Sequence, residues 1–280
     1  MNDVTGILKH TIPTMIGKSR RLHRLFSATG KSVIVPLDDS LISYSHEGLI
    51  PLRNKVENIQ SASPNGILCY QGTASLVSDY RIPLIYNVTA STTNSTHTNK
   101  VLISNVEDAL QCDASAVAVH LNVSSKYESN MLEIVGKVSS DCQRYGMPLL
   151  VIVYPRKEAS SNDDNYEEMK LNQPDEYARL VSHCVRIAFE LGADIIKTQY
   201  TGSSESFREV VAAAVNKPVL IAGGKFLNEE ILYDVVRGSI AAGGAGVSIG
   251  RNVFNRNNSN EIIANIKNIV FAGKTEDIND

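Results

Sequence analysis

Eight short apolar runs, rich in Val, Ile and Leu, recur along the chain without alternating with polar residues. Such uninterrupted runs indicate parallel strands that are buried on both faces. The stretches between them are long enough to hold helices, and several have an apolar spacing near 3.6 residues. The runs occupy residues 32–37, 66–70, 84–88, 116–121, 149–153, 194–197, 219–222 and 246–249.

Eight parallel strands with intervening helices can close into a barrel, and such barrels typically take about 250 residues. The 280-residue length therefore predicts an α/β fold, a (β/α)8 TIM barrel with a short N-terminal arm. We expect a single domain over residues 1–280, with the arm in 1–30 and the barrel in 31–272. Helices are expected at 175–191, 205–215 and 228–242. A doubly wound open sheet is the alternative.

Two polar segments flank this pattern. The arm carries Lys18, Arg20, Arg21 and Arg24, which we interpret as the solvated face of a helix that closes the barrel bottom or touches a neighbouring subunit. Residues 157–175 have the composition of a loop. In a barrel this loop would lie over the C-terminal mouth, where lids are found.

The charge balance excludes some partner classes. Lys and Arg number 27 against 30 Asp and Glu, a formal net charge of -3, so nothing attracts the whole chain to nucleic acid or to an anionic membrane. No window approaches the roughly 18 apolar residues that span a bilayer. The N-terminus also lacks a signal-type apolar core. We therefore expect a cytoplasmic protein with no membrane partner.

Cysteine and histidine spacing argues against a metal site, and we expect no cofactor. Cys69, Cys112, Cys142 and Cys184 form no C-x-x-C pair, so we expect each to be a small buried apolar residue. The histidines in the body of the chain lack H-x-H or H-E-x-x-H spacing: His46, His97, His120 and His183. His120 ends the fourth run, where it could hydrogen-bond a substrate or be structural.

Ionisable residues end several of the runs, which is where barrels place their chemistry. Burial of Lys197 at a strand end would favour the neutral amine, and that amine could form a Schiff base with a ketone. Alternatively, the lysine could snorkel to the rim. Asp38 could move protons, hold the lysine by charge, or cap a turn. Tyr154 could be a general acid or base, or a rim aromatic.

Glycines follow the seventh and eighth runs, as Gly223-Gly224-Lys225 and Gly250-Arg251. In barrels the loops at these two positions commonly bind phosphate. Glycines let backbone N–H groups approach an anion, and an arginine can hold two of its oxygens. A phosphorylated ligand is therefore predicted.

Together these segments resemble the Schiff-base (class I) aldolase superfamily, which includes deoxyribose-phosphate aldolase and the archaeal-type fructose-bisphosphate aldolases. A transaldolase branch of that superfamily is the most similar. The resemblance extends from about residue 18 to about residue 270. It is carried by residues 35–38, 89–92, 119–123, 154–156, 194–202, 205–208, 222–224 and 250–254.

The resemblance implies a metal-independent enzyme in which Lys197 forms the Schiff base, Tyr154 is the general acid/base and Asp38 assists proton transfer. The implied substrate-binding residues are Gly223, Gly224, Lys225, Gly250, Arg251, Arg156 and His120. The implied donor is a phosphorylated ketose or triose, and the implied acceptor is an aldehyde such as aspartate semialdehyde. A homo-oligomer is also implied, with a decamer of two rings as one form.

Three departures from the family pattern bear on substrate choice. Members usually read Asp-His-Gly where this chain has Asp38-Asp39-Ser40, and Gly where it has Lys157. The archaeal-type fructose-bisphosphate aldolases often carry Trp at the position of Ile152, and this chain has no Trp. The alternatives are a fructose-bisphosphate aldolase, a thiolase acting on a phosphorylated autoinducer, and a catalytically silent barrel that binds phosphosugars.

Overall fold

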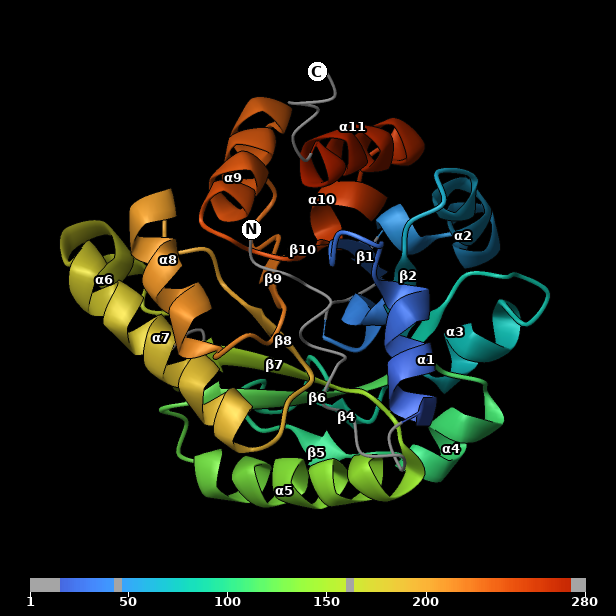
Figure 1. Cartoon of the computed structure of the whole chain (residues 1–280), viewed down its shortest axis with the longest axis horizontal. Coiled ribbons are helices and arrows are strands. Elements are labelled where there is room, and N and C mark those ends of the chain that lie inside the picture. Colours follow the sequence, from blue (N-terminus) through green and yellow to red (C-terminus); the bar gives the residue numbers. More distant parts are fainter. Residues whose placement is uncertain (1–15, 43–46, 160–163, 273–280) are drawn as a thin grey trace, which may run out of the picture.

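A computed structural model describes residues 16–42, 47–159 and 164–272 of the chain. Eight parallel strands form a closed barrel surrounded by helices (Figure 1). Around the barrel the strand order is β1-β10-β9-β8-β7-β6-β3-β2. This architecture confirms the predicted (β/α)8 barrel, and each predicted run supplies one strand. The strands are β1 (Ser32–Pro36), β2 (Gly66–Cys69), β3 (Leu84–Asn87), β6 (Ala116–Val123), β7 (Leu149–Pro155), β8 (Ile195–Thr198), β9 (Val219–Ala222) and β10 (Gly246–Ser248).

Helices follow the strands and pack on the outside of the barrel (Figure 1). They are α1 (Ile16–Leu25), α2 (Leu52–Ser61), α3 (Gln71–Leu76), α4 (Val106–Gln111), α5 (Glu128–Tyr145), α6 (Glu167–Asn172), α7 (Pro174–Glu190), α8 (Ser204–Ala213), α9 (Glu229–Ala241), α10 (Arg251–Phe254) and α11 (Ser259–Phe271). Two 3-10 helices, η3 (Asp38–Leu41) and η4 (Glu47–Leu49), follow β1. Short strands β4 (Thr89–Ala90) and β5 (Val101–Leu102) pair antiparallel outside the barrel.

Alternation along the strands divides the apolar residues into two cores. Inward positions such as Ile34, Leu150 and Ile195 fill the barrel, and outward positions such as Ile196 pack against the helices. Because side chains alternate with period two, Lys197 follows Ile195 on the inward side. The register pairs Lys197 with Ile152 of β7 and Leu220 of β9, both of which belong to the inner core. The strand pattern thus turns the lysine into the barrel.

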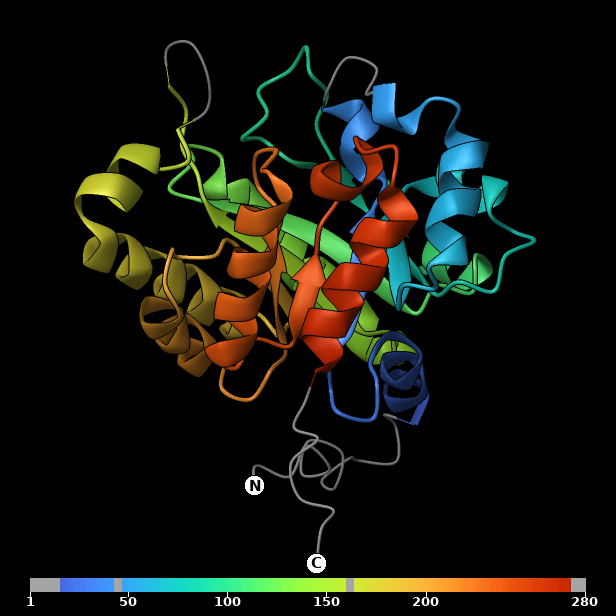
Figure 2. The same cartoon turned by 90° about the horizontal axis from the view of Figure 1, so that it is seen from above.

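The bottom of the barrel is closed by α1, which lies at the opposite end from α10 (Figure 2). Leu25 is fully buried in the inner core, with Leu22 and Phe26 packed beside it. The solvated-face interpretation of the arm is wrong for Lys18, because its ammonium is buried 2.8 Å from the Asp194 carboxylate. A buried lysine needs such a partner.

The other basic side chains of α1 differ among themselves. Arg21 donates to the Gly146 carbonyl at 3.1 Å, and Arg24 pairs with Asp113 at 3.1 Å. Arg20 and Arg24 are exposed, as predicted. The helix therefore joins the barrel bottom through apolar packing and polar contacts together.

Three further expectations need correction. Residues 157–175 are not only loop, since they contain α6 and the first residues of α7. Helix α6 is short and polar, so its helical pattern is weak, although Met169 packs against the outer core. Strands β6 and β7 continue two residues past their predicted ends, which puts Tyr154 inside a strand. Cys112 is only half-buried, whereas the other three cysteines are buried.

Among the helices that the structure describes, none combines the length and apolarity needed to cross a bilayer.

Candidate active site

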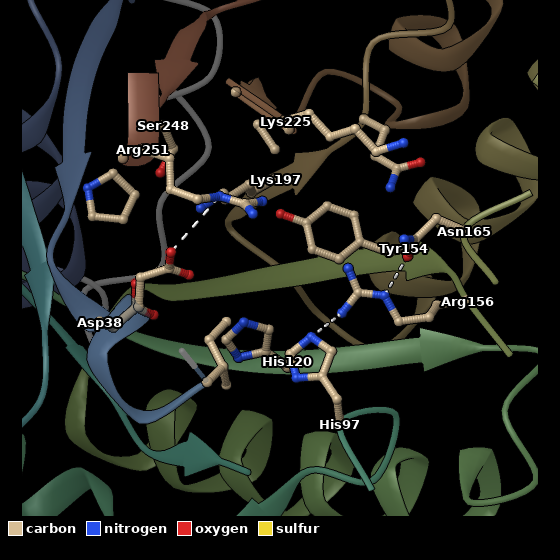
Figure 3. A pocket seen from close by; sticks show the side chains of 18 of the residues that line it. Asp38, His97, His120, Tyr154, Arg156, Asn165, Lys197, Lys225, Ser248 and Arg251 are labelled. Carbon is tan, nitrogen blue, oxygen red and sulfur yellow. Dashed lines mark hydrogen bonds and ion pairs between the residues drawn. The ribbon is translucent and has the colours of Figure 1, made fainter. Parts of the chain in front are cut away.

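A cavity of about 330 Å³ opens where the barrel strands end. It is lined by all ten residues that the sequence singled out: Asp38, His120, Tyr154, Arg156, Lys197, Gly223, Gly224, Lys225, Gly250 and Arg251. Figure 3 shows Asp38, Tyr154, Lys197 and Arg251 reaching into the same space, and they come from η3, β7, β8 and α10, respectively. Chemistry contributed by several strand ends is characteristic of barrel enzymes. The structure thus brings these residues together, and their individual roles remain predictions.

Lys197 lies near the floor of this cavity with only 7% of its surface exposed. Burial lowers the pKa of its ammonium, because desolvation penalises the charged form, and the Arg251 charge adds to this effect. The carboxylates of Asp38 and Asp39 act in the opposite direction. A lowered pKa increases the fraction of neutral amine, which is the nucleophilic form.

Asp38 occupies the first position of η3, directly after β1 and Leu37. Its Oδ2 accepts a hydrogen bond of 2.7 Å from Nδ2 of Asn87, which ends β3. Burial raises the pKa of the Asp38 carboxyl, while the positive charge of Lys197 opposes that shift. A carboxyl with a raised pKa is protonated more easily than a free one, which favours a role in taking up and returning a proton.

Tyr154 projects from β7, and its side chain joins the inner core. Burial raises the pKa of its phenol, so the hydroxyl is protonated at neutral pH and can donate a proton or a hydrogen bond. The Arg156 guanidinium lies 5.3 Å from the ring centroid, within cation–π distance. Figure 3 shows the Tyr154 hydroxyl directed toward the space beside Lys197.

The glycine loops form another wall of the cavity. Gly224 has a φ of 60°, the left-handed region that glycine adopts without a Cβ penalty. Asn252 fixes this loop, since its Nδ2 donates to the carbonyls of Gly223 at 3.0 Å and Lys225 at 2.9 Å. Its Oδ1 accepts from the Leu227 N–H at 2.7 Å. The residue next to Arg251 thereby fixes the backbone of the glycine loop.

A cationic cluster across the cavity includes two residues that the sequence did not identify as site residues. His97 and Lys100 lie between β4 and β5, and both line the cavity. Arg156 Nη1 lies 2.6 Å from His97 Nε2, and Lys100 Nζ lies 3.1 Å from His97 Nδ1. Burial and the neighbouring Lys100 and Arg156 charges lower the pKa of His97 to about 3, so its imidazole is neutral. Asn165 accepts from Arg156 Nε at 2.6 Å.

The local sequence around His97 and Lys100 does not indicate that these two residues belong to the site. Both lie in a polar stretch of Ser, Thr and Asn without a strand-end pattern. The β4–β5 pairing, together with hydrogen bonds from distant residues such as Asn122 to the Thr98 carbonyl, holds this stretch at the mouth. Gln199 and Tyr70 also line the cavity. Over the described part of the chain, no group of three or more His, Cys, Asp or Glu side chains is placed to hold a metal ion.

Comparisons with known proteins agree with this geometry. The model of the DeoC/LacD family aldolases matches residues 32–256. A 2-amino-3,7-dideoxy-D-threo-hept-6-ulosonate synthase of Archaeoglobus fulgidus is 36% identical over 245 residues, 86% of each chain. The class 1 fructose-bisphosphate aldolase of Thermoproteus tenax is 30% identical over 275 residues, 93% of this chain and 97% of its own. The crystal structure of an archaeal fructose 1,6-bisphosphate aldolase superposes with a TM-score of 0.79 at 27% identity, covering 91% of this chain and all of that one.

Proposed function

Because this chain belongs to the DeoC/LacD aldolase family and is a class I aldolase, we propose that Lys197 is its Schiff-base lysine and that it acts as a transaldolase. The supporting observation is that one buried cavity brings the Lys197 amine together with Asp38 and Tyr154. A desolvated lysine beside a carboxyl and a protonated phenol has the groups that iminium chemistry requires.

The proposed reaction begins when the neutral Lys197 amine attacks the donor ketone and forms a carbinolamine. Asp38 moves a proton from the new ammonium to the oxygen, Tyr154 gives its phenol proton to the departing hydroxyl, water leaves, and a protonated iminium remains. The Tyr154 phenolate then takes the proton from the donor's reacting hydroxyl as the carbon–carbon bond breaks, an aldehyde leaves, and the bonding electrons pass into the iminium to give an enamine. The enamine carbon attacks the acceptor aldehyde, and the new alkoxide takes the proton from Tyr154. Water, deprotonated by the Tyr154 phenolate, then attacks the iminium and releases the product from Lys197.

The cavity has two cationic regions. They support a donor and an acceptor that each carry an anionic group. Gly223, Gly224 and Arg251 would hold the donor phosphate. Arg156 and Lys100 stand on the other side and would hold an anionic group of the acceptor. The Archaeoglobus relative is named a 2-amino-3,7-dideoxy-D-threo-hept-6-ulosonate synthase, so we propose aspartate semialdehyde, which carries a carboxylate, as the acceptor.

We further propose that the enzyme works in the cytoplasm as a homo-oligomer, with a decamer of two rings as the form that the family resemblance implies. Light scattering after size exclusion measures the mass directly. A mass of 30.5 kDa, that of one chain, would contradict the proposed assembly.

Borohydride trapping tests the nucleophile. With dihydroxyacetone phosphate or a hexulose phosphate, reduction should add mass to Lys197 in the wild type and to no site in Lys197→Arg. Lys217→Arg is a matched control at the barrel bottom, where Lys217 lies 3.8 Å from Asp194, and it should trap like the wild type. An adduct that persists in Lys197→Arg would contradict the assignment of the nucleophile.

The same panel separates an enzyme from a silent barrel. If phosphoketoses bind and no adduct forms with any of them, the aldolase function is refuted. Full activity is expected in excess EDTA, and a loss that zinc restores would contradict a metal-independent reaction.

A further inference from the structure

The residue beside the proposed phosphate clamp is an acid. Asp39 follows Asp38 in η3, and its Oδ2 lies 3.7 Å from Nε of Arg251. Within residues 16–42, 47–159 and 164–272, no other side chain pairs with the Arg251 guanidinium. Position 39 is also one of those at which this chain departs from the family pattern. The clamp therefore has a negative charge of the protein's own beside it.

The geometry of this pair is that of a loose counter-ion. The contact reaches only Nε, and 3.7 Å is longer than a hydrogen bond. It does not involve the two terminal nitrogens of Arg251, which can hold two oxygens of a phosphate. The Arg251 side chain is 45% exposed and that of Asp39 is 18% exposed. Figure 3 shows the Arg251 guanidinium extending over the cavity beside Lys197. A dashed line in the figure marks the ion pair between its Nε and Asp39 Oδ2.

We propose that Asp39 is a specificity-determining residue, an internal counter-ion that competes with the substrate's anionic group for Arg251. This inference rests on the proposed binding of an anionic group at Arg251. An anion that reaches the clamp meets a carboxylate a few ångströms away, and the repulsion increases with the charge of the anion. A doubly charged phosphate is therefore disfavoured more than a singly charged group. The chain would select less strongly for phosphorylated donors than a chain with a neutral residue at 39.

Asp39 could instead help binding by holding Arg251 in position, which is the opposite effect. A single long contact to a half-exposed arginine fixes that side chain only weakly. Repulsion, in contrast, acts on every anion that the clamp binds, and the partly buried cavity screens it poorly. Competition is therefore expected to outweigh positioning.

The test is a calorimetric titration with inorganic phosphate, which requires no turnover. Asp39→Asn and Asp39→Ser should each bind phosphate about tenfold more tightly than the wild type, which corresponds to roughly 1.4 kcal/mol. Arg251→Gln should bind weakly, and adding Asp39→Asn to it should change the affinity less than about twofold, because the competition requires Arg251. Asp164→Asn removes the same charge beside Lys157 at the rim, and should also change the affinity less than about twofold.

Unchanged or weaker phosphate binding in both Asp39 variants would overturn the inference. Equal tightening with and without Arg251 would overturn it as well, since the effect would then be a general change in field. Borohydride trapping distinguishes this failure from failure of the proposed function. Normal trapping with unchanged phosphate affinity removes only the counter-ion, whereas absent trapping with the expected affinities removes only the Schiff-base lysine.

Discussion

Lys197 and Asp38 lie in one cavity, and two effects act on the pKa of each: burial and the charge of the other residue. Burial lowers the pKa of the lysine and raises that of the carboxyl, so both shifts favour the neutral forms. Each charge also stabilises the other, which limits both shifts. Burial therefore brings the two pKa values closer together than those of the free side chains, and that favours the proton transfers of carbinolamine formation and dehydration.

Replacement of Asp38 separates the effect of its charge on the pKa of Lys197 from its proposed role as a proton carrier. In Asp38→Asn, loss of the opposing negative charge lowers the pKa of Lys197 further, so the neutral amine forms at lower pH. The rising limb of kcat/KM against pH should shift to lower pH. The plateau should fall by about 10²-fold, because the proton carrier is gone. Asp164→Asn at the rim should change neither, and a limb that shifts to higher pH would contradict the charge argument.

The sequence predicted the location of residues that end or directly follow an apolar run. Lys197 ends one run and Tyr154 directly follows another, and the carboxyl ends of parallel strands meet at one mouth, where both residues line the cavity. His97 and Lys100 depend instead on the pairing of Thr89 with Leu102 outside the barrel. Two-residue strands leave no periodic pattern, so those site residues could not be predicted.

At the scale of elements, the loop after β9 depends on a residue from the element after β10. Asn252, fully buried in α10, makes three hydrogen bonds to the backbone between Gly223 and Leu227. The sequence predicted the glycines but not the residue that holds them, because the partners are 25 to 29 positions apart. For the same reason α6 was missed, since its stability comes from packing of Met169 rather than from its own six residues.

Asn252→Ala should disorganise the phosphate wall, the loop of residues 223–225 that is proposed to bind phosphate. It should leave the proposed nucleophile Lys197 in place. Loss of the three part-buried hydrogen bonds of Asn252 leaves these backbone groups without their side-chain partner, so the free energy of unfolding should decrease by about 2 kcal/mol. The KM for a phosphorylated donor should rise at least tenfold, while trapping of an unphosphorylated ketone at saturation should be unchanged. Asn258→Ala removes only an exposed contact to Glu261, and should alter neither quantity. Equal losses for both donors would contradict a role confined to the phosphate wall.

At the scale of the whole molecule, the cavity and α1 lie at opposite ends of one barrel. Arg251, the first residue of α10, lines the cavity, and Figure 2 shows α10 and α1 at opposite ends. Asp194 directly precedes β8, the strand that carries Lys197, and its carboxylate contacts α1. Its Oδ2 accepts the Leu149 N–H at 2.9 Å and lies 2.8 Å from Lys18 Nζ. The helix therefore completes the inner core and neutralises a buried charge at the bottom of β8.

Lys18→Met tests whether α1 is an integral part of the barrel. The substitution leaves Asp194 buried, with Lys217 at 3.8 Å as its remaining cation, so the free energy of unfolding should decrease by about 3 kcal/mol. Arg24→Ala breaks an exposed ion pair of the same helix and should cost less than about 1 kcal/mol. Denaturant unfolding of both variants measures the difference, and kcat of the folded Lys18→Met enzyme should stay within about twofold, since the mouth is untouched. Equal costs for the two variants would mean that the buried pair contributes no more than a surface one. A large loss of kcat at full folding would mean that the bottom of β8 positions Lys197 directly.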